Sequence, residues 1–133
     1  MGLAGGVVAA LVGRRVSLPP ALLSSYPELS QVRLRRGGLP PLVAGWTLGR
    51  ASVRAVTMRR TVFLSRHASV EPSLLLHELR HVEQFLESRT FPLRYVWEFF
   101  RHGYHANRFE REARDYAASR LAAARSTPSH QDV

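Results

Sequence analysis

The sequence contains no cysteine, which excludes disulfides, thiolate metal sites and cysteine nucleophiles. It also lacks lysine: all 19 basic residues are arginine, and they give the chain a net charge of +9. Such usage is typical of the codon bias of a GC-rich genome, so the charge is weak evidence for nucleic-acid binding. No apolar run is long enough to span a bilayer. We therefore expect a cytoplasmic protein that has at most a weak affinity for a membrane surface.

The N-terminal stretch MGLAGGVVAALVGRR is apolar, but it lacks the positively charged start of a signal peptide. We interpret residues 1–17 as a packed or frayed segment of a soluble protein, and a weak membrane-surface anchor is the alternative. The length of 133 residues fits a single domain. The polar end, STPSHQDV, predicts a disordered tail over residues 126–133.

Hydrophobic periodicity predicts a short helix, then a small cluster of strands, then three helices. Strand patterns occur in QVRLRR, WTLGRASVRAVTM and RTVFLS, with a turn predicted at Arg59-Arg60. Helical patterns run from Pro72 to Ser88, over FPLRYVWEFFRHGY with an end near Gly103, and over NRFEREARDYAASRLAAAR with Asn107 as its N-cap. The short connections between strands favour an antiparallel sheet, and so an α+β fold.

One helix carries the sequence His77-Glu78-Leu79-Arg80-His81. Residues four apart share a helix face, so His77 and His81 can present their imidazoles to one metal ion. Glu78 is one step further round, where it reaches a metal-bound water as a general base without being a ligand. Such a pattern also arises by chance on ordinary helices. The surrounding leucines indicate a buried helix, where unpaired histidines would be costly.

A catalytic zinc site needs a third protein ligand. Glu110 shares a helix face with Ala113 and Ala117, small residues that let two helices approach each other. Glu112 points about 160° away from Glu110. We favour Glu110 as the third ligand, with Glu112 as the alternative. The candidates considered are Glu98, His102, His105, Glu110 and Glu112.

The segments LLLHELRHVEQ and GYHANRFEREARDYA resemble the gluzincin-type minimal zinc peptidases. The match is closest to small bacterial metallopeptidase domains with a HELxHVxQ helix and a later FExEA segment. The resemblance covers residues 56 to 118. It implies a minimal zincin-like domain over residues 1–125, in which a small antiparallel sheet packs on the HExxH helix and a following helix carries the third ligand. It also supports Glu110 as that ligand.

The resemblance implies a zinc-dependent peptidase that cleaves peptide bonds with a zinc-activated water and Glu78 as general base. A substrate polypeptide would pair with an edge strand within Val56 to Leu64, and nearby arginines (Arg59, Arg60 and Arg66) would favour acidic peptides. Tyr104, His105 and His102 are candidate oxyanion donors, although ordinary packing is the preferred interpretation of each. A backbone carbonyl, Asp115 or Glu112 would orient a histidine ligand.

The alternative function is a non-catalytic arginine-rich module that binds nucleic acid or an acidic partner and carries a structural or vestigial metal site. The arginines are spread along the whole chain and do not cluster with aromatic residues, which argues against nucleic acid. The aromatic residues Phe91, Tyr95, Trp97, Phe99 and Phe100 are interpreted as packing between helices. A hydrophobic substrate pocket or a membrane-facing surface is the alternative.

Overall fold

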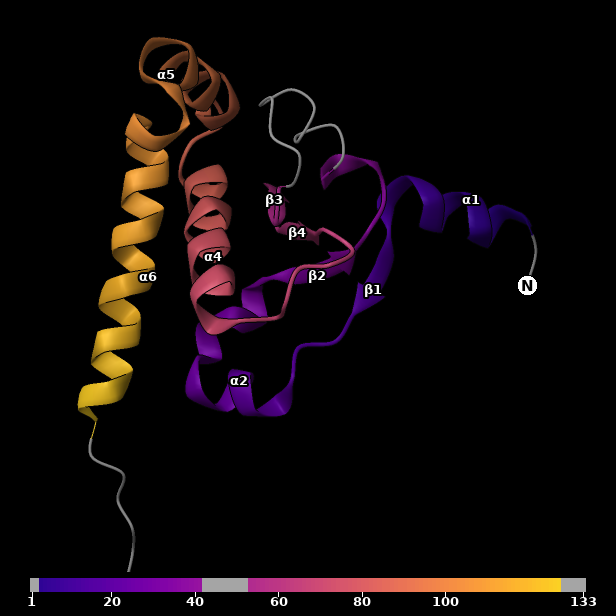
Figure 1. The fold of residues 1–133 in the computed structure, drawn as a ribbon, viewed down its shortest axis with the longest axis horizontal. Coiled ribbons are helices and arrows are strands. Elements are labelled where there is room, and N and C mark those ends of the chain that lie inside the picture. The colour runs from indigo at the N-terminus through magenta and orange to yellow at the C-terminus, as the bar shows by residue number, and fades with distance from the viewer. Residues whose placement is uncertain (1–2, 42–52, 128–133) are drawn as a thin grey trace, which may run out of the picture.

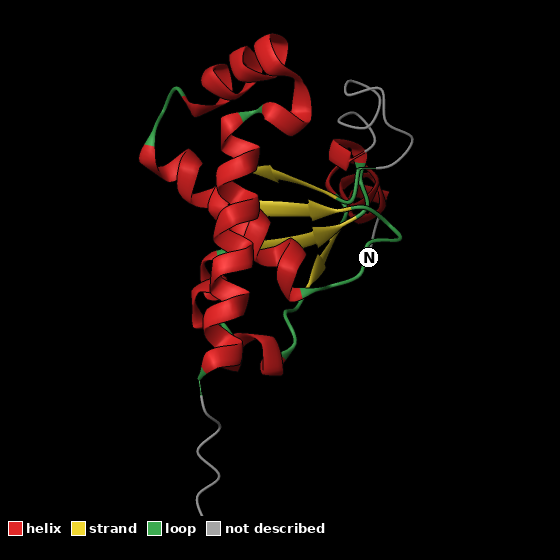
Figure 2. Ribbon diagram, turned by 60° about the vertical axis from the view of Figure 1, so that its left-hand side comes forward, coloured by secondary structure: helices red, strands yellow, loops and turns green. Residues whose placement is uncertain are grey.

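The computed structural model describes residues 3–41 and 53–127, which form a small sheet with the three longest helices gathered on one side (Figures 1 and 2). Its elements, in chain order, are α1 (Leu3–Val12), β1 (Arg14–Val16), α2 (Pro20–Ser25), the 3-10 helix η1 (Pro27–Gln31), β2 (Arg33–Arg36), β3 (Ala55–Met58), β4 (Thr61–Leu64), α4 (Pro72–Glu87), α5 (Phe91–Ala106) and α6 (Arg108–Ser126).

The four short strands form one sheet in the order β1-β2-β4-β3. β1 pairs with β2 and β3 with β4 in antiparallel fashion, whereas β2 and β4 run parallel. The α+β fold class is confirmed, but the predicted antiparallel sheet is wrong for this central pair. The second strand of the β3–β4 hairpin, β4, lies against β2, and β2 and β4 point in the same direction. β3 is therefore an edge strand among the described elements.

The hairpin turn lies at Arg59-Arg60, as the sequence predicts. Arg59 has a φ of 58°, a left-handed conformation that glycine or asparagine adopts more readily than arginine. Residues 46–52, the first half of the segment predicted as the preceding strand, lie outside the described residues.

α4 lies between the sheet and α6, and the two helices run side by side (Figure 1). Leu75, Leu79 and Val82 of α4 are fully buried in the main hydrophobic core, which also takes in the strand residues Val62 and Leu64. The predicted helix from Pro72 to Ser88 is confirmed to within one residue. α6 reaches Ser126, the first residue of the predicted tail, and residues 128–133 lie outside the described part.

α5 crosses one end of the α4–α6 pair (Figure 1). Gly103 has φ 76° and ψ −178°, so the helical geometry breaks where the sequence predicts the end of this helix. The aromatic residues divide between the two faces of α5. Phe91 is buried, whereas Trp97 and Phe100 are 61% and 78% exposed. Packing between helices thus accounts for Phe91 but not for the outer face.

α1 is a helix with a largely exposed surface that includes Val7, Val8 and Leu11. The structure gives this segment regular helical geometry, which neither sequence interpretation of residues 1–17 specified. None of the helices in the described ranges combines the length and the apolar character that crossing a membrane would require.

We predict that Arg59→Asn stabilises the protein by about 1 kcal/mol, because asparagine tolerates the left-handed conformation better than arginine. Urea denaturation would measure the change in the free energy of unfolding. Arg60→Asn is the matched control: it removes the same charge from the same turn, and Arg60 has no positive φ. Equal stabilities for the two variants would contradict a strained Arg59.

Candidate metal centre

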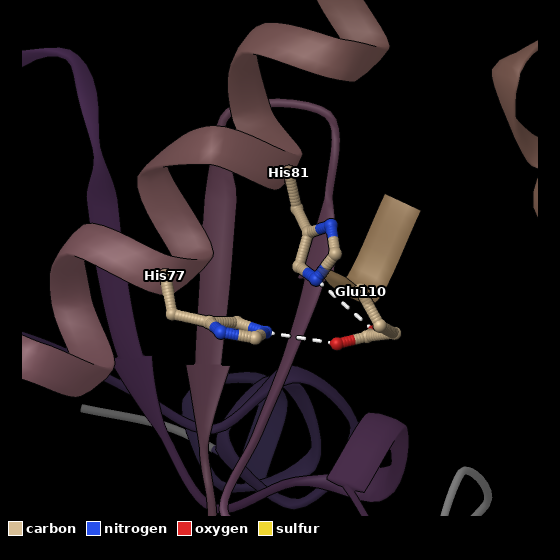
Figure 3. A group of neighbouring side chains, drawn as sticks. All are labelled: His77, His81 and Glu110. Atoms are coloured by element: carbon tan, nitrogen blue, oxygen red, sulfur yellow. Dashed lines mark hydrogen bonds and ion pairs between the residues drawn. The ribbon is translucent and has the colours of Figure 1, made fainter. Parts of the chain in front are cut away.

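Two histidines from α4 and one glutamate from α6 converge on a single point (Figure 3). His77 Nε2 lies 2.9 Å from Glu110 Oε2, and His81 Nε2 lies 3.1 Å from Glu110 Oε1. One nitrogen or oxygen atom from each residue lies within 4.8 Å of the others, and His81 and Glu110 are buried. The structure therefore brings together the three residues that the sequence nominated as metal ligands, in a group able to hold a metal ion.

The start of α6 places Glu110 next to the histidines. The side chain of Asn107 caps this helix by accepting a hydrogen bond of 2.9 Å from the backbone N–H of Phe109. Ala113 and Ala117 are buried on the same side as Glu110. Their small side chains let α6 lie close to α4, as the helix-face argument predicted.

Glu112, the alternative ligand, lies outside this group. Its carboxylate accepts hydrogen bonds from Arg80 on α4. Arg80 also pairs with Glu83 at 2.7 Å and with Glu87 at 2.9 Å. Glu110 and Glu112 are two positions apart on α6, and this spacing turns one carboxylate toward the histidines and the other toward a surface ion-pair network.

The hydrogen bonds of Gln84 fix the orientation of His81. The Nε2 group of Gln84 donates to the backbone carbonyl of Phe109 at 3.2 Å, so its Oε1 atom must face His81 Nδ1, which is 2.8 Å away. Nδ1 of His81 therefore carries a proton and donates a hydrogen bond to Gln84 Oε1. His81 Nε2 then faces the Glu110 carboxylate with either a second proton or a lone pair that a cation can accept. This arrangement fits a metal ligand, because bound imidazoles normally donate their other N–H group.

The charges at the site depend on the Glu110 carboxylate. Burial alone would raise the pKa of Glu110, but the hydrogen bonds to His77 and His81 outweigh it and hold the pKa well below its usual range. Burial would lower the pKa of His81, but the hydrogen bond to Glu110 and the nearby charge of Glu78 raise it to about 9. A positive charge is thus strongly favoured beside this carboxylate, and a proton or a metal ion can supply it.

Tyr95 of α5 also binds Glu110. Its hydroxyl donates to Glu110 Oε1 at 2.7 Å, and the side chain of Asn107 donates to the Tyr95 backbone carbonyl at 3.2 Å. Burial and the adjacent charge of Glu110 raise the pKa of Tyr95 above its ordinary value. The hydroxyl therefore stays protonated and serves as a donor that holds the carboxylate in place.

Glu78 is buried and lines the same cleft as the two histidines and Glu110. Its Oε2 atom accepts a hydrogen bond of 2.7 Å from the hydroxyl of Thr57 on the edge strand β3. The cleft has a volume of about 1230 Å³, and aromatic and aliphatic side chains of α5 form one wall. A carboxylate held in this way, beside three convergent ligand atoms, is placed to exchange a proton with a molecule in the cleft.

Sequence reasoning missed Thr57, Gln84 and Tyr95 as parts of the site. The sequence contains a signal that could have identified Gln84: it follows His81 by three residues on one helix and is the last residue of the HELxHVxQ pattern. Asp115 was a candidate for orienting a histidine ligand, but it is exposed, and Gln84 forms the hydrogen bond to His81. Thr57 and Tyr95 come from other elements, and their meeting with α4 and α6 depends on the fold.

Tyr104, His105 and His102, the candidate oxyanion donors for which ordinary packing was the preferred interpretation, differ in position. Tyr104 and His105 line the cleft. His102 does not, and its Nε2 atom lies 4.0 Å from Glu98 Oε2. Arg114 donates to the backbone carbonyl of His105 at 2.6 Å, which ties α6 to the end of α5.

Residues 25–89 match the model of the eCIS core domain, slightly less than half of the chain. This range runs from the end of α2 through α4, so it contains His77, Glu78 and His81 but stops before Glu110. No curated protein and no solved structure matches the chain. The match covers strands β2, β3 and β4 and the HExxH helix, and it does not show a metallopeptidase family.

We predict that Glu110→Gln abolishes stoichiometric zinc binding and that Glu112→Gln keeps it. The two substitutions remove the same charge from the same helix, but Glu110 alone faces the histidines. Elemental analysis of the purified variants would measure zinc content, with circular dichroism as a check on folding. Zinc that disappears only with Glu112→Gln would refute the assignment.

We predict that Gln84→Leu weakens zinc binding by about 10- to 100-fold, because His81 loses the acceptor that fixes its ring. Competition with a coloured chelator would measure the affinity. Gln31→Leu, at an exposed position in η1, is the control and should bind zinc like the wild type. Unchanged affinity in Gln84→Leu would show that this hydrogen bond does not matter for the site.

Proposed function

We propose that the protein is a zinc-dependent peptidase in which His77, His81 and Glu110 hold the metal and Glu78 is the general base. The observation that supports this most is the pairing of a three-ligand group with a buried carboxylate in one cleft. The HExxH spacing brings these groups together, because it puts two ligands four residues apart on one helix face and the base next to the first of them.

The ligand set favours zinc over other cations. Two imidazole nitrogens and one carboxylate oxygen form a ligand set found in catalytic zinc sites, in which water takes the open position. Magnesium and calcium prefer sites made of oxygen atoms alone. When bound, zinc lowers the pKa of a water molecule in its open position and polarises the scissile carbonyl.

Glu78 moves the proton in this scheme. Thr57 holds Oε2 of its carboxylate, and this carboxylate takes the proton of the attacking water as the water adds to the carbonyl carbon. The C–N bond then breaks, and Glu78 returns the proton to the leaving amine. Tyr95 stays hydrogen-bonded to Glu110, which keeps the third ligand oriented while charge builds up at the reacting carbonyl.

The edge strand supports a polypeptide as the substrate. β3 pairs with β4 on one side, and its other side has no partner strand among the described elements. A substrate in extended conformation can add to this edge through backbone hydrogen bonds, which places a peptide bond in the cleft beside Thr57. The sequence predicted that the substrate-pairing edge strand lies within Val56 to Leu64. Within this range only β3 can pair with a substrate, because β4 lies between β2 and β3 in the sheet.

A non-catalytic arginine-rich module with a structural or vestigial metal site is the alternative. The eCIS core domain is described by a name that specifies no reaction, so the matched segment fits either function. The intact Glu78 and its hydrogen bond to Thr57 favour catalysis, because a purely structural metal site needs no base beside it.

We predict that Glu78→Gln keeps zinc and loses all hydrolysis of fluorescein-labelled casein by the zinc-loaded protein. The amide cannot accept the proton of the attacking water, and the three ligands remain in place. Release of labelled fragments would measure cleavage, and elemental analysis would measure the metal.

Glu87→Gln is the matched control, because Glu87 is an exposed acid at the C-terminal end of the same helix. It should cleave casein at the wild-type rate. Cleavage by Glu78→Gln at that rate would exclude Glu78 as the base. Tight zinc binding without cleavage of casein by the wild type would favour the non-catalytic alternative.

A further inference from the structure

Four arginines surround a second pocket at one end of the sheet, which we call the arginine pocket. Arg33 opens β2, Arg59 and Arg60 form the β3–β4 turn, and Arg89 follows α4. The pocket has a volume of about 760 Å³, and all four side chains are exposed. In residues 3–41 and 53–127, none of the four forms an ion pair with an acid.

Some arginines outside the pocket are neutralised within the fold. Arg80 contacts three glutamates, and Arg120 pairs with Glu28. Such partners are scarce in the sheet region, because residues 29–70 contain eight arginines and no aspartate or glutamate; Arg54 pairs with Glu71, just beyond this range. Like charges that crowd around a cavity repel one another, and an anionic ligand would relieve this repulsion. The arginine pocket therefore has the charge of an anion-binding site.

The rest of the lining suits an amino-acid side chain. Met58, Phe85, Leu86 and Pro92 provide apolar surface between the guanidinium groups. A glutamate can lay its methylene groups on such a surface while its carboxylate meets the planar donor fork of an arginine. Among the described residues of the lining, Phe85 is the single aromatic side chain, whereas single-stranded nucleic acids are held by several stacking rings along a basic groove.

The arginine pocket adjoins the cleft of the metal centre. Met58, Phe85 and Pro92 line both. Thr57 holds Glu78, and the next residues along β3 are Met58 and then the arginine turn. At about 3.3 Å per residue, a chain paired with β3 would reach the arginine pocket about two to four residues from the bond beside Glu78.

We propose that the arginine pocket binds acidic side chains of the polypeptide substrate and selects for them near the cleaved bond. The inference rests on the proposed function, because the peptidase cleft supplies the chain that enters the pocket. Arg66, which the sequence suggested as a further acidic contact, is not part of the lining: it follows β4 at the opposite end of that strand.

The test uses a fluorescein-labelled peptide with a run of glutamates and a counterpart with glutamines in the same positions. Fluorescence anisotropy at physiological ionic strength measures their binding to the full chain without added metal. The wild type should bind the glutamate peptide about tenfold more tightly than its counterpart. Arg60→Gln/Arg89→Gln should lose most of this preference, since two charge contacts disappear together.

Arg15→Gln/Arg125→Gln is the matched control, because both positions are exposed, lie outside the arginine pocket and carry the same total charge. It should keep the preference. Equal weakening in both double variants would show an effect of net charge alone and would overturn the proposal. Tighter binding of a labelled single-stranded oligonucleotide, lost in Arg60→Gln/Arg89→Gln, would assign the pocket to nucleic acid and would also overturn it.

Hydrolysis of the same two peptides by the zinc-loaded protein separates this inference from the proposed function. Preferential binding of the glutamate peptide without cleavage of either peptide would support the pocket and contradict the peptidase. Cleavage of both peptides at equal rates, unchanged in Arg60→Gln/Arg89→Gln, would support the peptidase and refute the pocket.

Discussion

The close contact of α6 with α4 is the constraint on which the rest of the site depends. HExxH supplies two imidazoles and a carboxylate on one helix, but a third ligand must come from elsewhere. Ala113 and Ala117 keep the interface narrow, and the side chain of Glu110 then spans the remaining gap to His77 and His81. A larger side chain at either alanine would push the helices apart and separate the ligands, even though every ligand remained in the sequence.

The sequence carried most of the information about the two long helices of the site. The spacing of His77 and His81 and the face shared by Glu110, Ala113 and Ala117 are local properties of a helix, and periodicity reveals them. Gln84 was within reach of the same argument, since it lies on the helix face of His81. The helix-face argument thus anticipated a group of three side chains that can hold a metal ion.

The sheet was harder to foresee. The strand patterns of β2, β3 and β4 were visible, but their pairing depends on how the hairpin docks, and short connections suggested neighbours in chain order. The parallel contact of β2 with β4 decides that β3 lies at the edge, and hence that Thr57 meets Glu78. The same order gathers the arginines at positions 33, 59 and 60 at one end of the sheet. Tyr95 contacts Glu110 from a third helix, and the periodicity of a single helix does not predict such a contact.

Asn107 joins three parts of the site through a single buried amide. Its side-chain oxygen accepts a hydrogen bond from the Phe109 N–H and so caps α6. Its side-chain nitrogen donates to the backbone carbonyl of Tyr95, and the hydroxyl of Tyr95 donates to Glu110. The length of this junction is consequently as important as its composition. Each residue advances a helix by about 100°, so one inserted or deleted residue between Asn107 and Glu110 would turn the carboxylate away from both imidazoles. Surface loops generally tolerate insertions and deletions, but the four residues from 107 to 110 do not share that tolerance.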